Sequence, residues 1–279
     1  MTQSPPATHA APAPAGLVRR NAAGMLTAAA LTLIVSLGSY LLFLAMGSPL
    51  SHAAVGSLAL TSFWIACCSG VFAITGTDGW AATMRVGACV DASIILLLVL
   101  WLSSIPIDLW DAVRMYLLWA AGGVTALAVV RMARSTWARA TLALLVAGVS
   151  AIMLSSPFWI GGPLQSLSGD AAKTAAAWAV RANLFFAVSV LLAEPLSFSW
   201  PQSPLMYDIT RLGDYVPIPS VGWYETLGLY LAIAVVAGTV AGVRSGAGRR
   251  RMSRSRLSPA ERENPPADRR TGEPPSRGG

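Results

Sequence analysis

The sequence predicts an all-α integral membrane protein: a six-transmembrane-helix bundle with an extracytoplasmic interfacial or re-entrant helix between spans five and six. Of the 279 residues, 54% are hydrophobic and only 12% are charged, whereas soluble domains carry about 25% charged residues. No acidic or basic residue occurs between Arg20 and Asp78. A soluble fold could not keep so long an uncharged stretch out of water. The apolar runs are each close to the length of about 20 residues that crosses a bilayer.

The first span follows Arg19 and Arg20. A signal peptide is the alternative, because basic residues precede an apolar core, but this run of 23 residues exceeds the apolar region of about 7–15 residues in such peptides. Clusters of Gly, Pro and Ser separate the later spans, since these residues interrupt helices. The six expected spans cover residues 25–47, 55–76, 86–105, 109–130, 140–161 and 226–243.

The fourth span opens on three charged residues that share one helical face, Asp108, Asp111 and Arg114. An acid before a helix accepts a hydrogen bond from its unpaired N–H groups, and an acid in the first turn meets the positive end of the dipole. We therefore expect a capped helix start with Arg114 paired to Asp111. The alternative is an outer gate.

Residues 171–194 look helical, with Asp170 as a plausible N-cap and Pro195 as a stop. Lys173 and Arg181 divide this segment, and its uninterrupted apolar part, Leu184–Ala193, is only ten residues long. That length suits an interfacial or re-entrant helix and is too short for a crossing.

The distribution of positive charge predicts the orientation. With six spans and the N-terminus inside, the inner segments hold sixteen Arg and Lys residues and the outer segments four. A seventh span at 171–194 would place the ten arginines of residues 244–279 outside, against the positive-inside rule. We expect a multi-pass protein of the cell membrane with both termini in the cytoplasm.

The domain organisation follows from these spans. Residues 1–18 are expected to be a disordered lead, residues 19–244 the membrane domain, and residues 245–279 a disordered basic tail. The tail carries most of the net charge of +7, so we expect it to meet anionic lipid and expect no nucleic-acid partner.

The membrane domain includes an extracytoplasmic cap, residues 162–225. Its part 195–224 holds six Phe, Trp and Tyr residues and five prolines, which suits an ordered, non-helical layer at headgroup depth. A floppy loop is the alternative.

Asp91 is the first candidate functional residue. It lies about five residues into the expected third span, roughly 8 Å below the end of that helix. An intramembrane acid can carry protons or bind a cation. The alternatives are snorkelling to the interface and an ion pair with Arg85.

Three further candidates, Asp208, Arg211 and Asp214, fall within the cap. Acids and an arginine beside the interface could bind a phosphorylated head group, as a lipid-modifying enzyme would require. A solvated turn is the alternative.

Several chemistries are excluded. His9 and His52 are the two histidines, too few and too far apart for a bis-histidine haem or a zinc site. Cys67, Cys68 and Cys89 lie in apolar runs and form no CxxC pair, so we expect packing residues. No GxxxxGK[ST] or GxSxG motif occurs. We therefore expect no cofactor and no metal, and predict that the chain is not an autonomous enzyme.

The topology is similar to that of the permease subunits of ABC-2-type exporters. This resemblance covers the order of spans and the outer helix between spans five and six. It implies a permease-like transporter component that works with a partner ATPase. Well inside the expected spans the strongly polar residues are Asp91 and scattered Ser and Thr, which suits lipidic or apolar substrates better than hydrophilic cargo. One alternative is a non-transporting membrane scaffold or assembly protein, and a second is a lipid-modifying enzyme. The permease needs a solvent-accessible, polar-lined path, whereas the scaffold needs no path, and a tightly packed bundle with no cavity would count against the permease.

Overall fold

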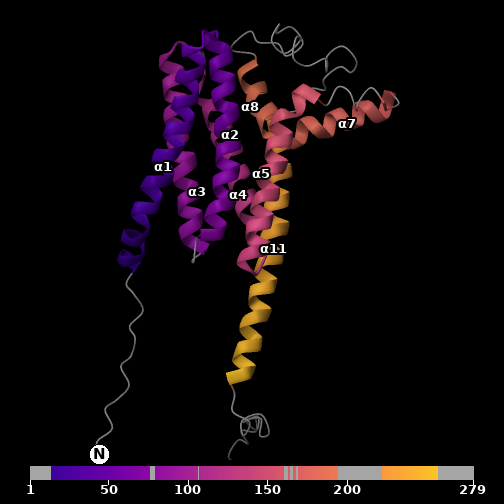
Figure 1. Ribbon diagram of the computed structural model, residues 1–279. Coiled ribbons are helices and arrows are strands. Elements are labelled where there is room, and N and C mark those ends of the chain that lie inside the picture. The colour runs from indigo at the N-terminus through magenta and orange to yellow at the C-terminus, as the bar shows by residue number, and fades with distance from the viewer. Residues whose placement is uncertain are drawn as a thin grey trace, which may run out of the picture. The chain divides into compact units, whose positions relative to one another are not determined.

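The computed structural model describes residues 14–75, 79–105, 107–159, 163, 166–167, 169–193 and 222–256. All regular elements in these ranges are helices. They are α1 (Pro14–Ala45), α2 (Leu50–Thr75), α3 (Gly79–Leu102), α4 (Leu109–Arg131), α5 (Thr136–Trp159), α7 (Gly169–Ala182), α8 (Leu184–Ala193) and α11 (Trp223–Arg256). The chain divides into two compact units, Met1–Gly238 and Thr239–Gly279. Figure 1 shows how the helices of the first unit are arranged.

Six of the described helices are long and apolar enough to cross a membrane, as the sequence predicts. The spans are Ala22–Ala45, Leu50–Thr75, Gly79–Leu102, Leu109–Arg131, Thr136–Ser156 and Trp223–Arg244. The fold class of a multi-pass helical bundle is therefore confirmed.

The helices extend beyond the spans into both terminal segments. Helix α1 begins at Pro14, inside the expected lead, and α11 continues to Arg256, inside the expected tail. Alanine and arginine are good helix formers, so a helix does not have to end where the apolar run ends. The remaining residues of both segments lie outside the described ranges.

Helix α2 occupies the centre of the bundle, where it contacts α1, α3, α4, α5 and α8. Hydrogen bonds between side chains add to its packing, and such bonds stabilise helix pairs where no water competes. They join the hydroxyl of Thr61 to Ser36 (3.0 Å), the indole of Trp64 to Thr32 (3.1 Å) and the indole of Trp119 to Ser62 (2.8 Å).

Two ends of the bundle can be distinguished. We call the end of the bundle where α1, α3 and α5 begin the near end, and the opposite end the far end. At the near end the Arg131 guanidinium donates to the Gly79 carbonyl at 2.6 Å. At the far end, Gly47 closes α1 with φ +77°, a conformation that glycine adopts without strain. Its amide donates to the Leu44 carbonyl at 2.9 Å.

The predicted start of α4 is confirmed. The Asp108 carboxylate accepts a hydrogen bond from the Asp111 amide at 2.7 Å, and Arg114 pairs with Asp111 at 3.0 Å. The Arg114 guanidinium also lies 5.6 Å from the centre of the Trp223 ring, a cation–π distance. This contact connects α4 to the beginning of α11.

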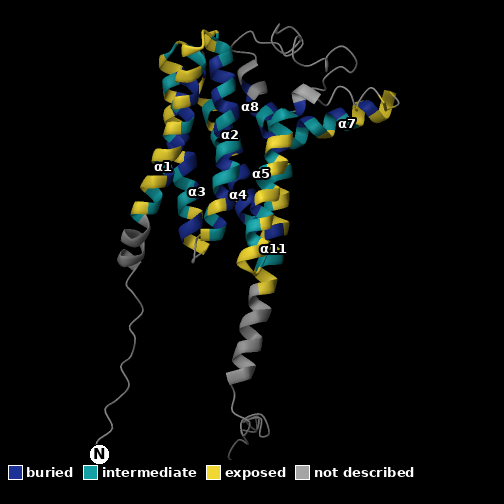
Figure 2. Ribbon diagram, viewed as in Figure 1, coloured by how far each residue is buried: buried dark blue, intermediate teal, exposed yellow. Residues whose placement is uncertain are grey.

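Burial is uneven among the spans (Figure 2). In α4, 56% of the most apolar stretch is buried, whereas the values are 6% in α5 and 11% in α11. Large apolar side chains such as Leu144 and Val235 are exposed, as expected for residues that face lipid. Helices α5 and α11 are therefore the least buried of the six spans.

Where the sequence suggests one helix from residue 171, the described residues 169–193 form two, and Asp170, the expected N-cap, lies in the first turn of α7. Asn183 separates α7 from α8. Helix α8 covers Leu184–Ala193, the apolar part that was judged too short to cross. It is not among the six spans, and it packs against α2, α4, α5 and α7. Helix α7 is amphipathic, with Ala172, Ala176 and Val180 buried.

Candidate functional site

The break between α7 and α8 is organised by one buried side chain, Asn183. Its amide nitrogen donates to the Met153 carbonyl and, at 3.1 Å, to the Ser156 hydroxyl, both on α5. Its amide oxygen accepts from the amides of Phe185 at 3.0 Å and Phe186 at 3.4 Å. Asn183 therefore caps the N-terminus of α8 and fixes it to α5, which satisfies backbone groups that would be costly to leave unpaired.

Helix α11 reaches the same break. The Tyr230 hydroxyl donates to the Ala182 carbonyl at 3.0 Å, and the Tyr230 carbonyl accepts from the Thr125 hydroxyl of α4 at 2.8 Å. Nearer the beginning of α11, Glu225 forms an ion pair with Arg181 of α7. The break is therefore held by α4, α5 and α11 together.

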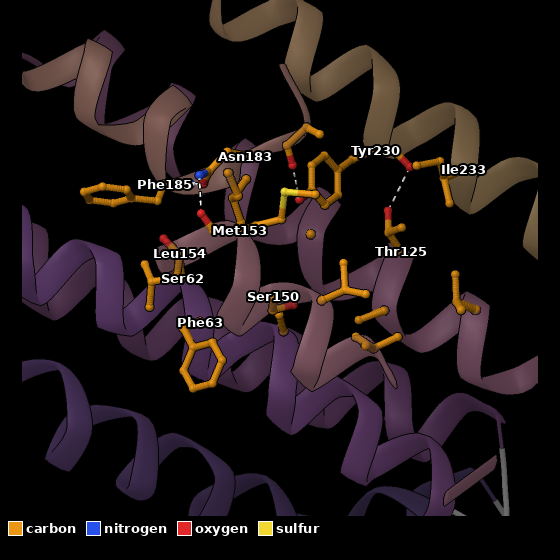
Figure 3. A pocket seen from close by; sticks show the side chains of 18 of the residues that line it. Ser62, Phe63, Thr125, Ser150, Met153, Leu154, Asn183, Phe185, Tyr230 and Ile233 are labelled. Atoms are coloured by element: carbon orange, nitrogen blue, oxygen red, sulfur yellow. Dashed lines mark hydrogen bonds between the residues drawn. The ribbon is translucent and has the colours of Figure 1, made fainter. Parts of the chain in front are cut away.

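A cavity of about 430 Å³ lies beneath the break, between α2, α4, α5 and α11. Figure 3 looks into it, with Asn183 and Phe185 of the break, Ser150 and Met153 of α5, and Tyr230 of α11 around it. Most of its lining is aliphatic or aromatic. Two of its polar residues, Thr125 and Tyr230, already bind other groups of the protein, so the cavity presents a mainly apolar surface.

Close packing shapes the upper wall. A Cβ atom on Gly122 of α4 would lie 2.9 Å from Cδ2 of Leu184, which is closer than carbon atoms approach. A larger residue at this position would require the end of the Leu184 side chain to shift.

The cavity can bind, but its lining offers little for catalysis. Tyr230 is the one titratable residue that lines it, and its hydroxyl donates to a backbone carbonyl. In the part of the chain that the structure describes, no group of three or more His, Cys, Asp or Glu residues could hold a metal. An apolar molecule is the ligand that this surface suits.

Asp91 is placed differently from the prediction. Because α3 begins at Gly79, the residue lies about 18 Å along the helix, near its middle and not near its end. Its carboxylate accepts a hydrogen bond from the Tyr116 hydroxyl of α4 at 2.9 Å. Arg85 is directed elsewhere: a Cβ on Gly24 would lie 2.8 Å from its Nε atom. Among the described residues Asp91 forms no ion pair with Arg85, while the alternative of snorkelling to the interface stays a prediction.

The other candidates, Asp208, Arg211 and Asp214, lie outside the described residues. So does nearly all of the expected aromatic layer at 195–224. The three cysteines are free, and Cys89 is buried, as expected for packing residues.

The sequence analysis missed Asn183 and the cavity. One signal was available, because an asparagine directly before the apolar run Leu184–Ala193 fits an N-cap. The cavity left no such signal, since its lining comes from separate parts of the chain.

Comparison of the chain with protein-family models, with curated proteins and with solved structures gives no match. The fold and the site therefore define its class. It is a multi-pass helical membrane protein with an apolar, partly open cavity beside a broken helix.

Proposed function

We propose that this chain is a permease-like membrane subunit that binds a lipidic or other apolar molecule in the cavity and works with a partner ATPase. The cavity of about 430 Å³ is the observation that supports this function. Its volume falls within the range of about 300–1,000 Å³ that is usual for small-molecule sites. A subunit that serves only as a scaffold has no need of such a space.

Two features of the cavity wall add support. Non-helical backbone at membrane depth is tolerated where protein buries it or where it lines a cavity, and transporters use such broken helices at their binding sites. The α7–α8 break at Asn183 lines this cavity. Helices α5 and α11, the least buried spans, also line the cavity, so a molecule can enter from the bilayer beside them.

The proposed cargo follows from the lining. A hydrophilic molecule would lose its hydration without gaining hydrogen bonds, because Asn183, Thr125 and Tyr230 are already bonded within the protein. An apolar or lipidic molecule loses nothing of this kind. Within this proposal the chain itself performs no chemical step, and the ATPase supplies the energy.

We further propose that the near end of the bundle faces the cytoplasm and that the membrane is the cell membrane. The support is the excess of arginine at this end: Arg131, Arg134 and Arg139 lie around the α4–α5 connection. A reporter that is active only in the cytoplasm, fused after Arg256, should be active. A silent but well-expressed fusion would contradict the orientation.

Filling the cavity tests the binding function. Ser150 lines the cavity on α5, and Ser150→Trp would occupy much of it. Gly148→Trp is the matched control, because a Cβ at Gly148 meets nothing within 4 Å and residues two apart lie on nearly opposite faces of a helix. The probe is a phosphatidylcholine with a photoreactive acyl chain, reconstituted with the purified protein.

We expect cross-links on the cavity side of α5, including Met153, in the wild type and in Gly148→Trp. They should fall at least fivefold in Ser150→Trp. Cross-links spread over the exposed faces of the spans and unaffected by Ser150→Trp would refute the proposed cavity function and leave the scaffold interpretation. A nucleotide-binding subunit that co-purifies with the chain would support the partnership, and its absence from intact membrane extracts would count against it.

A further inference from the structure

Large apolar side chains are exposed on the outward face of α3 and α4, toward the far end of the bundle. The exposed fraction is 58% for Trp101, 52% for Leu98 and 79% for Leu109. Between the two helices lies a groove of about 620 Å³. We call this the α3–α4 groove and define its walls by Ile94, Leu98, Trp101, Leu109, Val113 and Tyr116.

Asp91 lies beside this groove, at the end that is nearest the middle of α3. It is exposed, and the Tyr116 hydroxyl that lines the groove donates to its carboxylate at 2.9 Å. In the described ranges no Arg, Lys or His forms an ion pair with Asp91. A carboxylate therefore faces outward near the middle of a membrane span with one tyrosine as its hydrogen-bond donor.

This position is costly if lipid covers it. An aspartate at the centre of a span is costly to insert, and intramembrane charges pair with one another or face a protected space. The phenol satisfies only part of the carboxylate, which can accept several hydrogen bonds. The geometry favours a cationic partner that arrives from outside the chain.

The apolar walls narrow the choice of partner. A lipid ammonium group stays at headgroup depth, about half a bilayer away from Asp91. A transmembrane helix, in contrast, can lie along the groove and place a basic side chain at mid-depth. A second copy of this chain offers no suitable base in the described spans, since Arg85 lies against Gly24 and Arg114 pairs with Asp111.

We propose that the α3–α4 groove binds a transmembrane helix of a different protein, and that this helix carries a lysine or arginine at mid-depth that pairs with Asp91. The groove is walled by α3 and α4, whereas the apolar cavity lies between α2, α4, α5 and α11. The proposal therefore does not depend on whether the cavity binds a lipid.

A designed peptide tests the chemistry of this surface. The probe is a transmembrane helix of leucine and alanine with one central lysine, and the reference peptide has leucine at that place. The full-length protein carries the photoreactive residue p-benzoylphenylalanine in place of Leu98, in the groove, or in place of Leu144, which is 74% exposed on α5. Protein and peptide are reconstituted together in phosphatidylcholine vesicles, and cross-linked product is measured.

We expect the lysine peptide to cross-link from position 98 at least fivefold more than the leucine peptide, and to show no preference at position 144. Asp91→Asn should abolish the preference. This variant keeps an oxygen that can accept from the Tyr116 hydroxyl, so the local fold is retained. The double variant Asp91→Asn with Ile152→Asp moves the carboxylate to α5. It should not restore the preference for the lysine peptide. Asp91→Lys should prefer a peptide with a central glutamate.

Three results would overturn the proposal. The first is equal cross-linking of the lysine and leucine peptides from position 98. The second is a lysine preference that persists in Asp91→Asn or returns with Ile152→Asp. The third is cross-linking between copies of the protein from position 98 that depends on Asp91, which would make the partner a second copy.

Discussion

Asn183 should be the most sensitive single position of the α7–α8 break. In Asn183→Ala the cap on α8 and both donations to α5 are lost. Loss of an N-cap costs about 1 kcal/mol, and interhelical hydrogen bonds in membranes are worth about 0.6 kcal/mol each. We expect a loss of about 2 kcal/mol in the free energy of unfolding, roughly a 30-fold change in the equilibrium constant.

The Asn183→Ser variant separates the two contributions. A serine hydroxyl can still cap α8, but it is too short to reach α5, so about half of the loss should remain. Unfolding in mixed micelles with increasing dodecyl sulfate, followed by tryptophan fluorescence, measures both variants. If Asn183→Ala unfolds within about 0.5 kcal/mol of the wild type, the break is not held by this side chain, and the reasoning fails.

The same unfolding assay checks three further substitutions. Gly122→Val should lower the free energy of unfolding by about 1–3 kcal/mol because its side chain would overlap Leu184. The control Gly148→Val lies in open space and should not lower it. Equal effects of the two variants would refute the close packing of α4 on α8. Trp119→Phe should cost about 1 kcal/mol through the lost bond to Ser62, more than Trp80→Phe at a residue that is 63% exposed. Arg181→Gln should cost at most about 1 kcal/mol, less in high salt, because its ion pair with Glu225 is partly exposed.

The spans could be predicted because one physical constraint sets them. A helix that crosses hydrocarbon needs about 20 apolar residues, whatever its neighbours are. All six were therefore found from local composition. The same reasoning identified Leu184–Ala193 as too short to cross, and α8 has these bounds.

Helix boundaries depended on tertiary contacts and were less predictable. The third span was expected to begin at 86 because Arg85 is charged. The helix begins at Gly79 instead, since the long Arg85 side chain can extend over Gly24 of α1. That shift moved Asp91 from the edge of the span to its middle, which changed its interpretation entirely.

The cavity could not be predicted, because no local pattern encodes it. Asn183 bonds to residues 30 and 27 positions earlier in the chain, and Thr125 bonds to a carbonyl 105 positions later. Each of these residues looks unremarkable in its own segment. The cavity between α2, α4, α5 and α11 depends on the distances between helices and not on the apolar character of any one of them.

The apolar cavity and the α3–α4 groove differ in how the polar groups near them are hydrogen-bonded. Inside the bundle, Thr61, Trp64 and Trp119 find partners on neighbouring helices, and Asn183 does so at the break. Polar groups that are satisfied internally hold helices in place and leave an apolar lining. Asp91 is satisfied only in part and faces outward. A cavity with a mainly apolar lining can select ligands by shape and apolar area, whereas an outward carboxylate can select a partner by charge. The first property suits a varied apolar cargo, and the second suits one specific subunit.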